Sequence, residues 1–398
     1  MRMSTANTYD ATIANLQRRA QELSQSQEQM SSLKRVNRAS DDPTAAARAE
    51  RALAVEARSA ASQRGIDASM NAVSQTESTL GDALTLLQQA RDTVVSAGNA
   101  SYSDAERANL ALTLRQMRAE LLTVANSPDG AGSYLFAGQG ASSPPFVDTP
   151  SGVQFRGVSG EAGAAATEPL PLTMDGQSTW LQARSGNGVF VTSATQQNGT
   201  AWIDSGRVTD PALVTGDAYS VSFAVSGATT TYTVLHNGNP TTLTNLPYKS
   251  GQAIEIDGLS VTVTGDPANA DRFDITPSSA SLSIFDALDR AATELETGGR
   301  NSGQLAQTVA DSLRDIDASA AKLTAQRSVA GETLNRIDRA TERLSGQKLA
   351  AQTDRSQAED LDMVEAISTF QKQQTGYQAA LQSYASVQKL SLFQYLNL

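Results

Sequence analysis

The two ends of the chain carry apolar side chains at alternating intervals of three and four residues, which is the spacing of one face of a helix. Each pattern has one polar interruption, Gln27 near the N-terminus and Gln374 near the C-terminus. Helices of about 30 residues with a single apolar face are marginal alone in water, because helix nucleation is costly. We therefore expect partner helices to cover both faces. The apolar positions are Tyr9, Ile13, Leu16, Ala20, Leu23 and Met30, and then Met363, Ile367, Phe370, Tyr377, Leu381 and Tyr384.

A first helical arm follows the N-terminal pattern. Asp42 can cap a helix that opens with Pro43 and extends to about residue 97, since proline lacks the N–H that would be unpaired there. A second helix begins at Ser103, where Ser103 and Glu106 have the spacing of a capping box.

A second helical arm lies closer to the C-terminus. A short amphipathic helix over 285–295 is stopped by Gly298 and Gly299. From Val309 to Leu344 the apolar period then continues for about five heptads, which predicts a long helix that packs laterally. We expect the two arms to pack as an antiparallel helical bundle that brings the two ends of the chain together.

The segment between the arms has a different composition. Ten of the twelve prolines lie in 144–277, and alternating runs at 219–225 and 232–235, followed by a turn at 236–240, predict strands. The segment also holds both tryptophans and most of the negative charge. The predicted fold is mainly α with an inserted β domain. Its predicted domains are a terminal coiled-coil assembly domain (1–42 plus 356–398), a helical bundle domain (43–138 plus 283–355) and an inserted outer β domain (139–282).

Composition narrows the function. The net charge of −11 argues against a general nucleic-acid or anionic-membrane binder, and no run of about 18 apolar residues predicts membrane insertion. There is no cysteine, which excludes disulfides, thiolate metal sites and cysteine nucleophiles. The first residues lack the apolar run of a cleavable signal peptide, so we expect a cytosolic protein or one secreted by a route without a cleaved leader.

Residues 32–43, Ser-Leu-Lys-Arg-Val-Asn-Arg-Ala-Ser-Asp-Asp-Pro, resemble the N-terminal signature of bacterial flagellins and flagellar hook-associated proteins. Three other segments favour the members that join hook to filament over flagellin itself. They are the start Met-Arg-Met-Ser-Thr, Gly-Ser-Tyr-Leu-Phe-Ala-Gly at 132–138, and Leu-Ser-Leu-Phe-Gln-Tyr-Leu at 390–396. The resemblance covers about 1–138 and 283–398.

This resemblance implies a flagellin-like fold and a structural subunit that self-assembles in a ring of protofilaments. The expected partners are other copies of the chain, the other hook-associated junction protein, flagellin, and an export chaperone that binds the C-terminal helix. The expected location is the extracellular flagellum, reached through flagellar type III export. No catalytic residue, cofactor or metal is expected.

The candidate site is therefore an assembly interface along the terminal helices and the loop after the first of them. The charged loop residues have a second interpretation, in which they only solvate the loop and cap a helix, and the aromatic C-terminal residues could be a frayed end. The candidate residues are Tyr9, Ile13, Leu16, Leu23, Met30, Arg35, Asn37, Asp41, Asp42, Ile367, Phe370, Tyr377, Leu381, Tyr384, Leu392, Phe393 and Tyr395.

Two alternatives remain open. The chain could be flagellin, the filament subunit, which a count of copies per organelle would distinguish. Alternatively, the β insert could be a glycan-binding or hydrolytic module, since an exposed pair of tryptophans, Trp180 and Trp202, would suit stacking on sugars. No convincing pair of catalytic carboxylates accompanies them, and the lone His236 is interpreted as a polar turn residue.

Overall fold

The structure is a computed structural model that describes residues 5–141, 143–164 and 168–396, without the side chains of 5–9 and 387–396. It is mainly helical, with a β-rich region between the N- and C-terminal helical arms, as the sequence predicts. The chain forms two compact units. Unit 1 comprises 1–64 and 341–398, and unit 2 comprises 65–340.

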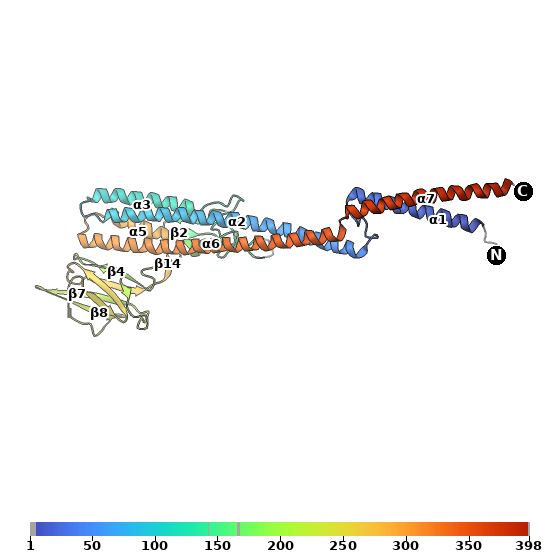
Figure 1. Cartoon of the computed structure of the whole chain (residues 1–398). Coiled ribbons are helices and arrows are strands. Elements are labelled where there is room, and N and C mark those ends of the chain that lie inside the picture. Colours follow the sequence, from blue (N-terminus) through green and yellow to red (C-terminus); the bar gives the residue numbers. More distant parts are fainter. Residues whose placement is uncertain (1–4, 142, 165–167, 397–398) are drawn as a thin grey trace. The chain divides into compact units, whose positions relative to one another are not determined.

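Unit 1 contains the two terminal helices, α1 (Thr5–Ser32) and α7 (Met363–Leu396), which pack against each other. They run antiparallel, so the N- and C-termini lie at the same end of the pair (Figure 1). The beginning of α2 (Pro43–Ala97) and the end of α6 (Ser302–Glu359) also belong to this unit.

In unit 2, α2 and α6 are joined by ion pairs whose order shows that the two helices are antiparallel. Arg91 contacts Asp317 at 2.9 Å, and Glu77 contacts Arg327 at 2.6 Å. The helix α3 (Asp104–Ala125) packs on α5 (Ile284–Glu296). The predicted capping box of α3 is present. On α5, all four apolar residues of the predicted face are buried: Phe285, Leu288, Ala292 and Leu295.

A small aromatic core joins the first part of the predicted insert to the helices. The indole of Trp180, at the end of α4 (Gly176–Trp180), lies edge-on to Phe136 and stacks on Phe285 of α5. Phe146 packs on both Trp180 and Phe285. Trp180 is only 1% exposed, so the prediction of an exposed tryptophan pair was wrong. Its position between segments far apart in sequence explains the burial.

Most of the remaining insert forms a β sandwich. The larger antiparallel sheet has the order β10-β8-β7-β13-β4, with β9 beside β8, and the second has the order β11-β12-β5, with β6 beside β12. One apolar core joins both sheets, and Val221, Val261 and Phe273 in it have no exposed surface. The predicted runs at 219–225 and 232–235 lie in β7 and β8, and Asn237 and Gly238 form the turn to β9 with positive φ.

The β1–β2 hairpin and the antiparallel pairing of β3 with β14, which lie far apart in sequence, complete the fold. The strands of the chain are β1 (Phe146–Thr149), β2 (Gly152–Phe155), β3 (Ala183–Arg184), β4 (Phe190–Gln196), β5 (Trp202–Ile203), β6 (Arg207–Val208), β7 (Tyr219–Ser226), β8 (Thr229–His236), β9 (Asn239–Pro240), β10 (Leu246–Pro247), β11 (Ala253–Ile256), β12 (Leu259–Thr264), β13 (Arg272–Pro277) and β14 (Ala280–Leu282).

Polar side chains of α6 attach the sandwich to the helices. The side chain of Gln307 accepts a hydrogen bond from the backbone N–H of Ile203 at 2.9 Å, and Gln304 donates to the carbonyl of Gln197. Further along α6, Arg314 donates to the carbonyl of Thr192 at 2.8 Å and also pairs with Asp315. These contacts satisfy backbone groups of the edge strands β4 and β5 and of Gln197, which follows β4, so the sandwich is attached to α6 at a defined place.

Candidate assembly interface

The candidate interface is built on the α1–α7 pair. Ser26, which is buried, donates a hydrogen bond from its hydroxyl to the side chain of Gln373 across the pair. A β-carbon at Gly376 would lie 2.5 Å from a guanidinium nitrogen of Arg19, so glycine leaves room for that side chain. These two contacts hold α1 and α7 in one register.

The pair covers its own apolar residues only in part. Ile13, Leu16, Leu23 and Met30 of α1 are half-buried, as are Phe370, Tyr377 and Tyr384 of α7. In contrast, Val364 is 82% exposed, and Ile367 and Leu381 are each 42% exposed. No predicted apolar position of α1 or α7 with a described side chain is fully buried. Large apolar side chains left at the surface along one helix are typical of a surface that contacts another molecule.

The loop between α1 and α2 is held to the end of α6. Arg35 donates its backbone N–H to the carbonyl of Glu359 at 2.7 Å, and its guanidinium reaches the carbonyl of Ala358 at 2.8 Å. Lys34 pairs with the Glu359 carboxylate at 3.1 Å. Leu33 has positive φ where the chain leaves α1. The signature therefore folds back on its own chain.

The two aspartates of the loop stabilise its backbone. Asp42 accepts hydrogen bonds from the backbone N–H groups of Thr44 and Ala45, which confirms that it caps α2. The hydrogen bonds from the Ala45 N–H, the Thr44 hydroxyl and the Arg35 guanidinium, in that order of effect, lower the pKa of the Asp42 carboxyl to about 2. Asp41 accepts from the N–H groups of Asn37 and Arg38.

A small apolar contact lies beneath the loop. Val36 is buried and packs with Ala45 and Ala49 of α2 and with Ala358 of α6. The side-chain nitrogen of Asn37 is buried and has no hydrogen-bond partner among the described residues. A buried polar atom without a partner is costly, so Asn37 is the loop residue whose geometry most favours an additional contact from another molecule.

Among the predicted loop residues, Arg35, Asp41 and Asp42 thus have partners inside the chain, and a role between subunits remains a prediction for them. The side chains of four predicted residues lie outside the described residues: Tyr9, Leu392, Phe393 and Tyr395. Sequence reasoning missed Ala358 and Glu359, which receive the loop, and the pair of Arg19 and Gly376. The loop residues that contact Ala358 and Glu359 are hundreds of positions away in the sequence, and Arg19 and Gly376 lie on different helices. No local pattern therefore indicates these contacts.

Two kinds of site are absent from the part of the chain that the structure describes. It contains no helix with a stretch long and apolar enough to cross a membrane. It also contains no group of three acidic, histidine or cysteine side chains arranged to hold a metal ion.

Comparison with known proteins agrees with this geometry at both ends of the chain. The bacterial flagellin N-terminal helical region matches residues 3–141, and the flagellin C-terminal helical region matches residues 313–396. The chain belongs to the flagellin family. Between these two regions, the D2-like domain of flagellar hook-associated protein 1 matches residues 191–277, which are the larger part of the sandwich.

Among relatives, flagellar hook-associated protein 3 of Salmonella typhimurium is 36% identical over 152 residues, covering 38% of this chain and 48% of that protein. The flagellar filament 41 kDa core protein of Borreliella burgdorferi is 28% identical over 123 residues, covering 31% of this chain and 37% of that protein. The chain spans about half the length of the hook-associated relatives that it matches in sequence.

A solved structure is similar over a larger share. The crystal structure of flagellar hook associated protein-3 from Legionella pneumophila has a TM-score of 0.70 and 26% identity. The match covers 77% of this chain and 96% of that one. This flagellin-family chain therefore shares its arrangement of helical arms and inserted β region with that protein.

Proposed function

We propose that the chain is a structural subunit of the bacterial flagellum that joins the hook to the filament, and that it assembles through its terminal helices. Similarity to hook-associated protein 3 in sequence and in structure supports the location. The observation that carries the mechanism is the α1–α7 pair, which leaves Val364, Ile367 and Leu381 exposed along one helix. Burial of such side chains against neighbouring copies would stabilise a ring of subunits.

The proposal assigns a role to each part of the chain. Residues 1–42 and 356–398 form the assembly domain, 43–138 and 283–355 the helical bundle domain, and 139–282 the outer domain. The interface comprises the seventeen candidate residues given above. The partners are other copies, the second junction protein and flagellin, with a chaperone that binds the C-terminal helix before export. The proposed location is the extracellular flagellum, reached through flagellar type III export, and the proposed role is structural rather than enzymatic.

The experiment uses a bacterium in which every copy of this subunit carries the substitution and the other flagellar proteins are unchanged. Ile367→Gln combined with Leu381→Gln removes apolar surface while keeping good helix formers. The variant is expected to be exported and folded, but filaments should be lost and flagellin shed into the medium. Leu112→Gln with Val329→Gln is the matched control, since these side chains are 56% and 51% exposed on unit 2. Filaments of normal number and length in the first variant would refute the proposal.

The alternative in the same class is flagellin, which the similarity to the Borreliella burgdorferi filament protein favours. This match is shorter and weaker than the match to hook-associated protein 3, so flagellin is the less favoured function. Counting copies of the chain per flagellum separates the two functions, because a junction subunit forms a thin collar and flagellin forms the whole filament.

A further inference from the structure

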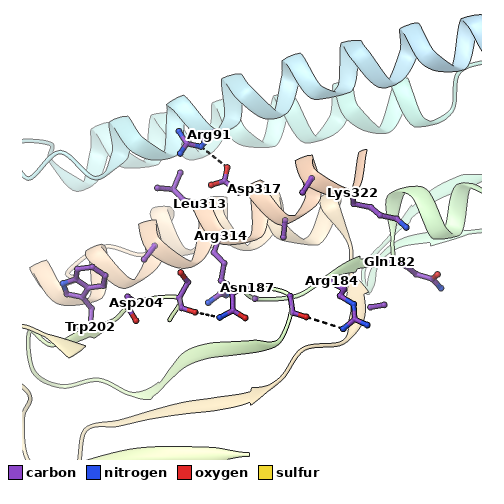
Figure 2. Close-up of a pocket in the computed structure, with 17 residues that line it drawn as sticks. Arg91, Gln182, Arg184, Asn187, Trp202, Asp204, Leu313, Arg314, Asp317 and Lys322 are labelled. Carbon is purple, nitrogen blue, oxygen red and sulfur yellow. Dashed lines mark hydrogen bonds and ion pairs between the residues drawn. The ribbon is translucent and has the colours of Figure 1, made fainter. Parts of the chain in front are cut away.

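A cleft of about 820 Å³ lies in unit 2, where loops of the sandwich face α6 (Figure 2). Its lining from the sandwich side includes Asn187 and Trp202. From α6 it includes Leu313, Arg314 and Lys322. This volume is within the range of pockets that hold small molecules, and the cleft belongs to no part of the proposed assembly interface.

The cleft is basic although the chain as a whole is acidic. Arg91 in the lining pairs with Asp317, and Arg314 pairs with Asp315. Two other cations in the lining, Arg184 and Lys322, have no carboxylate partner among the described residues, and the Arg184 guanidinium donates only a long hydrogen bond of 3.4 Å to the carbonyl of Gly188. The lining also contains the carboxylate of Asp204, which accepts backbone hydrogen bonds from Gly206 and Thr262 and pairs with neither cation, so Arg184 and Lys322 remain available to an anionic ligand.

The rest of the lining combines one aromatic ring with neutral polar groups. Trp202 is half-buried and forms part of the wall. The side chains of Gln182, Asn187 and Ser205 add amide and hydroxyl groups. In the view of Figure 2, Trp202 lies toward one end of the cleft, and Arg184 and Lys322 lie toward the other. A ligand that used both ends would need to be elongated.

We propose that this cleft binds an acidic oligosaccharide, with one sugar ring against Trp202 and a carboxylate bound by Arg184 and Lys322. An apolar sugar face fits the indole, hydroxyl groups fit the amides, and a uronic-acid carboxylate fits the two free cations. The inference goes beyond the proposed junction function and does not depend on it. It also changes the glycan-binding alternative in two ways: only Trp202 contacts the sugar, and the sugar is acidic.

The test uses the full-length protein and trigalacturonate, a chain of three uronic acids. We expect saturable binding that changes tryptophan fluorescence, because Trp180 is buried elsewhere and Trp202 lines the cleft. Binding should weaken as salt rises, since the cations lie in an open cleft. Arg184→Ala and Lys322→Ala should each weaken binding about tenfold, which is the usual scale of a charge-assisted hydrogen bond. Trp202→Ala should weaken binding as measured by calorimetry.

Arg207→Ala and Lys249→Ala are matched controls, because they remove the same charge from exposed positions of the sandwich outside the cleft lining. Both should bind as the parent protein does, and circular dichroism checks that every variant folds. Neutral trigalactose and triglutamate are the comparison ligands. The proposal is overturned by no binding of trigalacturonate up to about 1 mM at low salt. It is equally overturned by unchanged binding in the cleft variants, or by equal binding of either comparison ligand, of which triglutamate would indicate an acidic-peptide site.

Discussion

The β sandwich and the α1–α7 pair are both made of amphipathic elements, but only the sandwich buries its apolar faces within the chain. Val221, Val261 and Phe273 of its core are completely buried. The corresponding apolar residues of the pair, such as Phe370, are half-buried, and Ile367 stays 42% exposed.

The difference follows from the number of surfaces that meet. Two sheets face each other in the sandwich, so each strand has neighbours in its own sheet and a second sheet across the core. Two isolated helices have only each other, and one seam covers one stripe of each. A sequence can therefore have a regular apolar period and still depend on other molecules to cover it.

The largest predicted effect is a loss of stability in the sandwich, whose core is completely buried within the chain. Phe273→Ala should lower the free energy of unfolding by about 3–5 kcal/mol, because it leaves a cavity in a closed core. Phe370→Ala should cost much less in the monomer, about 1 kcal/mol, because its ring is already partly in water. Urea unfolding followed by circular dichroism measures both. Equal losses would mean that the terminal pair is as well packed as the sandwich.

A smaller effect on stability comes from a carboxylate of α6 that lies near the residues bonded to the sandwich. Burial raises the pKa of Asp311 to about 6, although Arg314 lies 2.7 Å away. Since this pKa is higher in the folded than in the unfolded state, ionisation destabilises the fold as pH rises from about 4 through 6.

Asp311→Asn should therefore raise the free energy of unfolding at pH 7.5, by about 3 kcal/mol at most, and should have no effect near pH 4. Thermal or urea unfolding at the two pH values measures this difference. A variant that is less stable at pH 7.5 would show that the pairing with Arg314 outweighs burial.

The smallest effect is local and concerns the loop of unit 1. The lowered pKa of Asp42, held mainly by the N–H of Ala45, means that its stabilising contribution is present above its ordinary pKa near 4 and is lost as pH falls toward 2. Asp42→Ala should speed amide exchange in the first turn of α2 at pH 6. Asp41→Ala is the control, since Asp41 bonds to loop amides and not to α2. Unchanged exchange in the Asp42 variant would contradict the capping role.

The sequence predicted the features whose signals are local. The cap of α2 at Asp42, the capping box of Ser103 and Glu106, and the strands around Tyr219 all depend on residues a few positions apart, and all are present. The family signature predicted the flagellin-like arrangement for a different reason, because it reports ancestry rather than packing.

The rest depends on contacts between distant segments. Trp180 meets Phe285 and Phe136 because the chain returns to the helices before the sandwich begins, and no period reveals that return. Likewise, Arg35 finds its partners at the end of α6, more than 300 residues away, so the sequence indicated a charged loop but not where it binds.

Hydrogen–deuterium exchange of the dilute full-length monomer tests the central claim most directly, by comparing residues 10–32 and 363–386 with strands β7 and β13. In the dilute monomer we predict fast exchange in both terminal helices and slow exchange in the strands, and once subunits assemble we predict slow exchange in the helices as well. If the terminal helices and the core strands were equally protected in the dilute monomer, this claim would be contradicted.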